Sequence, residues 1–258
     1  MHKTPEIKSQ LKTLLSLEYN CTPSDFDASE NIITIARDIP GRRIYSPEKE
    51  FLSMVTLNRN VVITADERMH DWLKVWCADK PGFWLFEHEH LMELEAELQK
   101  YGKRLQQSHH MFLPKQQVVE VRRDFEIRWF EQSQLAPLYG KPEFSNALCS
   151  CFKPERPDML AVAAMDGEEI VGLAGCSADT QLFWQIGIDV LPGYRGKGMG
   201  TKLVQLLKNE TFRRGAIPFY GTSLSNLHSW NIAINAGFYP AWVEIATIEN
   251  CVENGGIL

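Results

Sequence analysis

The residues with the clearest chemical meaning stand between positions 195 and 201. Arg195-Gly196-Lys197-Gly198-Met199-Gly200 joins a predicted strand, residues 182–190, to a predicted helix over residues 201–214. The first backbone amides of a helix have no helical acceptor, and the helix dipole is positive at that end. Because glycines let a phosphate approach the backbone closely, the pattern predicts a pyrophosphate-binding turn.

The spacing of these glycines excludes two common phosphate-binding loops. A Walker loop requires Gly-Lys-Ser/Thr after a four-residue gap, and this sequence does not have it. A dinucleotide fingerprint requires Gly-x-Gly-x-x-Gly, whereas Gly196, Gly198 and Gly200 alternate with single residues. A glycine turn can also be purely structural, so the function depends on further motifs.

Two motifs in order give a family resemblance. Arg195, Gly198 and Gly200 match the pattern Gln/Arg-x-x-Gly-x-Gly/Ala between a strand and a helix, and Asn226–Ser229 is followed by Gly237-Phe238. Together they resemble the GNAT superfamily, the acetyl-CoA-dependent N-acyltransferases. The resemblance covers residues from about 118 to the C-terminus, and its subgroup is most similar to the zwittermicin-resistance-type acetyltransferases.

The resemblance implies an α+β fold with a mixed, mainly antiparallel sheet flanked by helices. We assign this acetyltransferase domain to residues 117–258 and a smaller α+β domain to residues 1–116. The first domain lacks the acetyltransferase motifs. Its role stays open between a degenerate half-copy of the fold and a cap over the acceptor site.

The resemblance also implies that acetyl-CoA is the cofactor and that an amine attacks its thioester directly. Amides of the glycine turn would hold the pyrophosphate, main-chain amides near the end of strand 182–190 would polarise the thioester carbonyl, and the second motif would contact the cofactor from the other side. The residues assigned to these tasks are Ile188, Val190, Arg195, Gly196, Lys197, Gly198, Met199, Gly200, Thr201, Asn226 and Ser229.

The catalytic side chains depart from the family pattern. Ala233 stands where many members have a tyrosine acid, and Gln185 stands nearest to a familiar glutamate base. An amine with a pKa of ~10.4 must lose a proton before it attacks, whereas a thiol of pKa ~8.5 leaves with little help. Asp189 is therefore the predicted base or amine anchor, and Tyr220 and Ser223 are predicted acids or substrate contacts.

The elements that must position these residues follow from periodicity and turn signals. In the second part, strands are predicted at 125–130, 159–165, 170–176, 182–190, 217–222 and 238–245, with Asp166-Gly167 as a hairpin turn. The first part predicts a helix from Thr4, three strands between residues 31 and 64, and helices after Asp66 and over 91–101. Residues 102–117 are polar and predict a linker.

Composition narrows the class of protein. The 258 residues include 27 basic and 33 acidic ones, and a net charge of −6 argues against a nucleic-acid-binding protein. No apolar stretch reaches the ~20 residues that span a bilayer, and the first ten residues are too polar for a signal peptide. The six cysteines form no CxxC pair and no metal site is predicted, so we expect a reduced, cytoplasmic protein.

The predicted partner is a small-molecule amine, with neither nucleic acid nor membrane, and a homodimer stays open. Two alternatives remain: an acetyltransferase that acts on proteins or peptides, and a non-catalytic module that binds acyl-CoA. The second alternative is favoured by two substitutions relative to the family pattern: Ala233 in place of a tyrosine and Gln185 in place of a glutamate.

Overall fold

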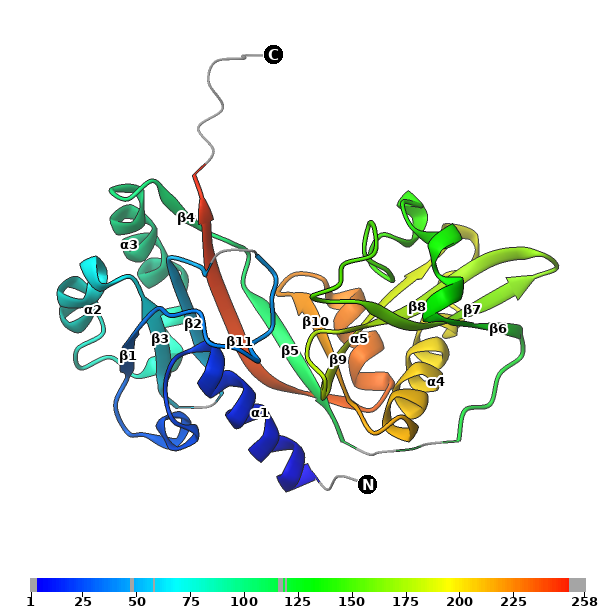
Figure 1. Ribbon diagram of the computed structural model, residues 1–258, viewed down its shortest axis with the longest axis horizontal. Helices are drawn as coiled ribbons and strands as arrows, with labels where there is room; N and C mark the ends of the chain where they lie inside the picture. Colours follow the sequence, from blue (N-terminus) through cyan, green and yellow to red (C-terminus); the bar gives the residue numbers. More distant parts are fainter. Residues whose placement is uncertain (1–3, 47–48, 58, 116–117, 119, 251–258) are drawn as a thin grey trace, which may run out of the picture. The chain divides into compact units, whose positions relative to one another are not determined.

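The structure is a computed structural model that describes residues 4–46, 49–57, 59–115, 118 and 120–250. Its helices are α1 (Thr4–Glu18), α2 (His70–Trp76), α3 (His88–Gln99), α4 (Met199–Arg213) and α5 (Leu227–Asn235). Its strands (Figure 1) are β1 (Ile32–Ile35), β2 (Leu52–Thr56), β3 (Val61–Ala65), β4 (Lys103–Leu105), β5 (His109–Pro114), β6 (Glu126–Glu131), β7 (Asp158–Asp166), β8 (Glu169–Ala178), β9 (Phe183–Val190), β10 (Ile217–Ser223) and β11 (Phe238–Glu249).

The strands join into one mixed sheet in the order β1-β3-β2-β11-β5-β10-β9-β8-β7-β6, and β4 pairs with β11. The pairs β1/β3 and β9/β10 are parallel. The pairs β2/β3, β2/β11, β6/β7, β7/β8 and β8/β9 are antiparallel. The predicted α+β class with a mainly antiparallel sheet and flanking helices is confirmed.

The chain divides into two compact units. One comprises the residues up to Gln10 together with His110–Ala241, and the other comprises Leu11–His109 together with the residues from Trp242 onward. The predicted domain boundary between residues 116 and 117 lies outside the described residues and stays a prediction.

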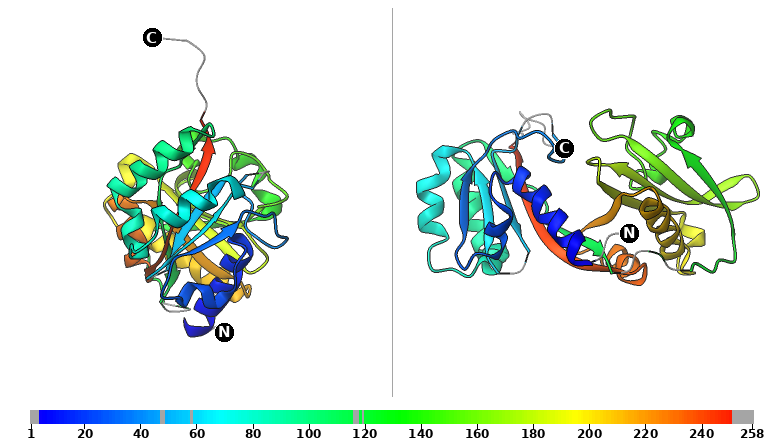
Figure 2. Two further views of the ribbon diagram at one scale, coloured as in Figure 1. Left: turned by 90° about the vertical axis from the view of Figure 1, so that its left-hand side faces the viewer. Right: turned by 60° about the horizontal axis from the view of Figure 1, so that its bottom comes forward.

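In the second of these units, α2 and α3 cover one face of strands β1 to β3 (Figure 2). Side chains alternate between the two faces of each strand, so Leu52 and Met54 of β2 lie on the same face of the sheet as Ile63 of β3. These side chains form the strand side of the core. Leu73 from α2 and Leu94 from α3 fill the space above them, and all of these side chains are buried.

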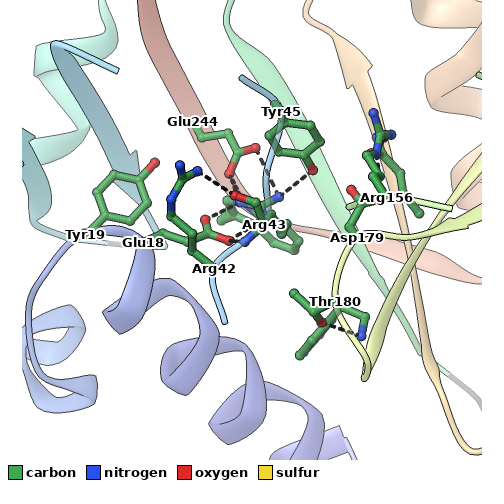
Figure 3. A network of polar contacts seen from close by, with 12 residues as sticks. Glu18, Tyr19, Arg42, Arg43, Tyr45, Arg156, Asp179, Thr180 and Glu244 are labelled. Atoms are coloured by element: carbon green, nitrogen blue, oxygen red, sulfur yellow. Dashed lines mark hydrogen bonds and ion pairs between the residues drawn. The ribbon is translucent and has the colours of Figure 1, made fainter. Parts of the chain in front are cut away.

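A buried ion cluster fixes the end of α1 in the same unit (Figure 3). The Arg43 guanidinium donates to both oxygens of Glu18 at 2.7 Å and to both oxygens of Glu244 at 3.3 and 2.8 Å. Trp242 donates its indole N–H to Glu244 at 2.6 Å. Because a buried charge is tolerated only when it is paired, this cluster ties α1 to β11.

In the other unit, the two faces of strands β7 to β9 have different coverings. Ile186, Ile188 and Val190 of β9 lie in the core on which α4 packs. The opposite face is covered by the segment that contains Leu135, Leu138, Phe144, Ala147 and Leu148, which packs on Ala161, Ala163 and Leu173. Figure 1 shows this segment and α4 on opposite sides of the strands.

Strand β5 lies in residues 102–117, for which the sequence predicts a polar linker, so that prediction is wrong for His109–Pro114. Met111, Phe112 and Leu113 are instead buried, and β5 lies between β11 and β10. The apolar run is only three residues long and is flanked by histidines and Pro114. Such a run is too short for periodicity to separate a strand from a loop. No helix in the described part of the chain is both long and apolar enough to cross a membrane.

Candidate active site

The glycine turn follows β9 and leads directly into α4. Gly196 and Gly198 have φ values of 81° and 75°, the left-handed region that glycine adopts without strain. A Cβ on either residue would meet nothing within 4 Å, so this side of the turn is open. The side chains of Arg195 and Lys197 are exposed beside it. The turn therefore offers backbone and positive charge to an anion.

The start of α4 completes this cradle. The Lys202 amide donates to the Gly198 carbonyl at 3.1 Å, which is the first bond of the helical pattern. The amides of Met199, Gly200 and Thr201 precede it, and the first amides of a helix have no acceptor within the helix. A pyrophosphate fits this geometry because its oxygens accept hydrogen bonds and the helix dipole favours negative charge.

Two contacts fix the turn and the helix against the sheet. The Arg195 Nε–H donates to the Val190 carbonyl at 2.7 Å, across the turn. A Cβ on Gly200 would lie 3.3 Å from Ile232 and 3.5 Å from Val190, so the glycine lets α4 pack closely on β9 and α5, and a side chain here would require Ile232 to shift by a few tenths of an ångström. Gly200 is therefore a packing residue as well as a candidate binding residue.

The parallel strands β9 and β10 part beside this turn. Their register pairs Phe183–Ile186 with Ile217–Tyr220 and ends there. β9 continues to Val190 and β10 to Ser223. An opening between parallel strands exposes main-chain groups that a linear ligand can bind. The predicted residues Ile188 and Val190 lie on β9 beyond this point of separation.

The second motif places a hydroxyl pair on the β10 side. Asn226 caps α5 by accepting from the Ser229 amide at 3.1 Å. The hydroxyl of Ser229 is hydrogen-bonded to that of Tyr220 at 2.7 Å. Tyr220 is 2% exposed, and burial raises the pKa of its phenol to about 12. The phenol therefore stays protonated near neutral pH.

The other two predicted catalytic residues have different surroundings. Ser223 ends β10, and its carbonyl accepts from the Asn226 amide at 3.2 Å. The Asp189 carboxylate accepts from the amides of Asn146 and Ala147 at 2.7 and 2.9 Å, and from the Asn146 side chain at 2.7 Å. The structure thus brings Tyr220 and Ser229 together and turns Asp189 toward the segment around residue 146.

A series of hydrogen-bonded polar side chains surrounds Gln185, which lies on the same face of β9 as Asp189. The Arg156 guanidinium donates to Asp179 at 2.8 Å, and Figure 3 shows these two residues. It also donates to the Gln185 side-chain oxygen at 2.9 Å. Ser177 also donates to Asp179, at 2.6 Å. Sequence reasoning missed Arg156 and Asp179, because no local motif links residues that meet only through the sheet register.

The absence of a metal from this site stays a prediction. Within the described ranges, no group of three or more His, Cys, Asp or Glu side chains is placed to hold a metal ion.

Comparison with known proteins agrees with the motif positions. Residues 120–238 match the family model described as the Acetyltransferase (GNAT) family. The match covers less than half of the chain, so it identifies this segment as similar to that family. Among curated proteins, no match to the chain was found.

Solved structures with a similar chain path include the following three bacterial proteins. A GCN5-related N-acetyltransferase from Sphaerobacter thermophilus is 16% identical, with 81% of this chain and 79% of that chain covered and a TM-score of 0.46. An acetyltransferase of the GNAT family from Colwellia psychrerythraea is 14% identical, with 60% and 61% covered and a TM-score of 0.41. The yncA protein of Salmonella typhimurium, solved with its cofactor acetyl-CoA, is 13% identical, with 52% and 99% covered and a TM-score of 0.35. The chain therefore spans less than two thirds of the length of the Colwellia protein.

Proposed function

We propose that this chain is an acetyl-CoA-dependent N-acetyltransferase that acts on the primary amine of a small molecule. The observation that carries the proposal is the turn from β9 into α4, with two left-handed glycines whose outer side is open. The family match over residues 120–238 supports the same reaction class.

Proteins of the matched family bind acetyl-CoA, and the residues of this turn fit that cofactor. The amides from Gly196 to Thr201 would hold the pyrophosphate, with Arg195 and Lys197 adding positive charge. Asn226 and Ser229 would contact the cofactor from the α5 side. When bound, acetyl-CoA supplies the acetyl group as a reactive thioester.

The chain's own groups would then stabilise charge and move a proton. Main-chain N–H groups near Ile188 and Val190 would donate to the thioester oxygen, where preorganised donors act most strongly. Tyr220 would act as the acid: its O–H passes a proton to the Ser229 hydroxyl, and Ser229 donates its own proton to the leaving sulfur. Because the pKa of this phenol, about 12, lies above the ~8.5 of a thiol, the transfer is uphill by itself and would have to be coupled to proton loss from the amine nitrogen, which returns a proton through water to the tyrosinate. Ser223 is a second candidate acid at the end of β10.

Proton removal from the amine has no assigned partner. Gln185 has no basic atom at neutral pH. The base role predicted for Asp189 stays a prediction, since its carboxylate accepts from Asn146 and Ala147 in this structure. An amine that arrives in its neutral form can lose its proton to water after the attack.

The small-molecule acceptor is inferred from the resemblance to zwittermicin-resistance-type acetyltransferases and from the additional unit of the chain. A cytoplasmic location accords with this proposal. Acetylation of a protein or peptide is the alternative within the same chemistry. The two alternatives differ in the acceptor alone, so an acceptor panel separates them.

The test is the release of free thiol from acetyl-CoA by the 258-residue chain. The panel contains aminoglycosides, polyamines, amino acids and peptides, each compared with a reaction without acceptor. We expect release that depends on one class of amine. Release with peptides but no small amine would overturn the proposed acceptor class.

The second candidate function is a non-catalytic module that binds acyl-CoA. It is favoured by Ala233 at the place of the family's tyrosine acid and by Gln185, whose amide oxygen is held by Arg156. This candidate predicts tight acetyl-CoA binding with no acceptor-dependent release for any member of the panel.

A further inference from the structure

The carboxylate of Asp189 holds a distant backbone segment on the sheet. One of its oxygens accepts from the amides of both Asn146 and Ala147, at 2.7 and 2.9 Å. The other accepts from the Asn146 side-chain amide at 2.7 Å. Three donors converge on one charged acceptor, and hydrogen bonds to a charged group are the stronger kind.

A pair of glycines lets this segment lie directly against the strands. Gly175 of β8 and Gly187 of β9 are register partners. A Cβ on Gly187 would lie 1.9 Å from the Asn146 carbonyl oxygen, and one on Gly175 would lie 2.2 Å from the Ala147 carbonyl oxygen. Any side chain at either position would push the segment away from the sheet.

The segment lies on the face of β9 that α4 does not cover. Side chains alternate along the strand, so Gly187 and Asp189 face away from Ile188 and Val190, which lie in the core beneath α4. Gly187 directly follows Ile186, the last β9 residue paired with β10. If acetyl-CoA held at the start of α4 reached between the two strands, its acetyl group would approach this opposite face, beside the segment that contains Phe144, Ala147 and Leu148.

We propose that Asp189 is a positioning residue that holds residues 144–148 as one wall of the acceptor site. This inference rests on the proposed acetyltransferase function. The Asp189 carboxylate acts through the segment of residues 144–148 that it holds. The shape of this segment decides which amines can approach the point where β9 and β10 separate. This positioning role is the alternative to the predicted proton abstraction by Asp189.

The kinetic test compares Asp189→Asn with Asn146→Ala in the 258-residue chain. Asparagine at 189 keeps one neutral acceptor oxygen and puts an N–H in place of the other charged oxygen, so the three donors of Asn146 and Ala147 lose their charged acceptor and one of its two oxygens. Alanine at 146 removes the side-chain bond. We expect both variants to raise KM for the amine by about tenfold or more, with kcat changed by less than about threefold. Affinity for acetyl-CoA and the pH dependence of kcat should stay as in the wild type.

The matched control is Glu168→Gln, which makes the same chemical change on the exposed β7–β8 turn. The side chain of Glu168 is 93% exposed and pairs only with Arg128 among its described ion pairs. This variant should leave every kinetic constant unchanged.

The opposite pattern identifies a base. If Asp189→Asn lowers kcat by about 10²-fold or more and removes a limb of the pH profile, while Asn146→Ala has no effect, the positioning role is overturned.

A measurement without turnover separates this inference from the proposed function. Hydrogen–deuterium exchange of the peptide that covers residues 144–148 reports whether the carboxylate protects the two amides. We expect exchange at Asn146 and Ala147 to accelerate by about tenfold or more in Asp189→Asn and not in Glu168→Gln. Equal protection in both variants overturns the inference, whether or not any amine is acetylated. Faster exchange without activity retains the backbone clamp and overturns its place in an acceptor site.

Discussion

Gly198 is the residue on which the assignment of the cofactor site depends most. Both its backbone conformation and the open space beside it suit a bound anion. Its φ of 75° lies in the left-handed region, and a Cβ there would meet open space. A purely structural turn would require the same backbone but would be indifferent to charge on its open side. Charge at this position therefore distinguishes anion binding from a structural turn.

The matched pair Gly198→Asp and Gly198→Asn tests this distinction. Both residues tolerate left-handed backbone and have the same shape, but only aspartate adds a negative charge. We expect aspartate to weaken acetyl-CoA binding by about tenfold or more relative to asparagine, measured by calorimetry. Equal affinities in two folded variants would remove the pyrophosphate from this turn.

Tyr220 offers a second test at the residue scale. Tyr220→Phe keeps the ring in its apolar setting and removes the hydroxyl that bonds to Ser229. General acids contribute about 10²–10⁴-fold, and a thiolate needs little assistance, so we expect kcat to fall by about 10²-fold. Unchanged kcat with saturating acetyl-CoA would exclude Tyr220 as the acid.

Sequence reasoning succeeds at this scale where the signal is local. The glycine turn and the Asn226 cap are set by neighbouring residues, and both have the expected geometry. The partners of Asp189, Asn146 and Ala147, are 43 and 42 residues away in the chain. No spacing rule connects them, because the contact exists only after the segment at residue 146 lies on the sheet.

Helix α4 contains a buried cation that shapes its packing on α5. Lys208 is fully buried, and its ammonium donates to the Ala236 carbonyl at 2.7 Å beside the ring of Phe238. Burial lowers the pKa of this ammonium to about 8. The Gly237-Phe238 pair that ends α5 is therefore also a packing site for α4.

The pKa of Lys208 predicts how stability depends on pH. Between pH 8 and the unfolded pKa of 10.5, the unfolded chain binds a proton that the folded chain has released. Stability from this residue therefore rises with pH, by about 1 kcal/mol between pH 7 and pH 9. Urea unfolding at the two pH values should show this gain in the wild type relative to Lys208→Met. Parallel pH dependence in both proteins would contradict the depressed pKa.

Strand β5 shows what sequence patterns miss at the scale of elements. Its buried core is Met111–Leu113, and its flanks read as polar linker. The longer strands β7 and β8 were predictable because Gly167, with φ of 59°, closes their hairpin where the Asp-Gly signal stands. A central strand needs few apolar residues when its neighbours supply the rest of the core.

At the scale of the whole molecule, both units combine segments that are distant in sequence. One unit joins His110–Ala241 to residues up to Gln10, and the other joins Leu11–His109 to residues from Trp242 onward. β11 passes from the first unit into the second. Because each unit is made of two separate segments, no single boundary in the sequence divides the chain into the two units. A change in composition along the chain therefore cannot locate them.

Two fragments test the predicted boundary. Residues 117–258 lack β5, the strand between β10 and β11, whereas residues 106–258 retain it. Losing three buried apolar side chains removes several kcal/mol, at about 25 cal/mol per Å². We expect the fragment of residues 117–258 to show no cooperative thermal transition. The fragment of residues 106–258 should show a more cooperative transition than the shorter one. A cooperative transition in residues 117–258 would support the predicted boundary.

Calorimetric titration of acetyl-CoA into the intact chain tests the central claim most directly, because both the enzyme and its non-catalytic alternative require this ligand. The proposed function predicts one molecule bound per chain with a dissociation constant between about 1 μM and 1 mM. Binding should be weakened by Gly198→Asp. A folded protein that gives no binding heat and no thermal stabilisation with acetyl-CoA would contradict the assignment of this site.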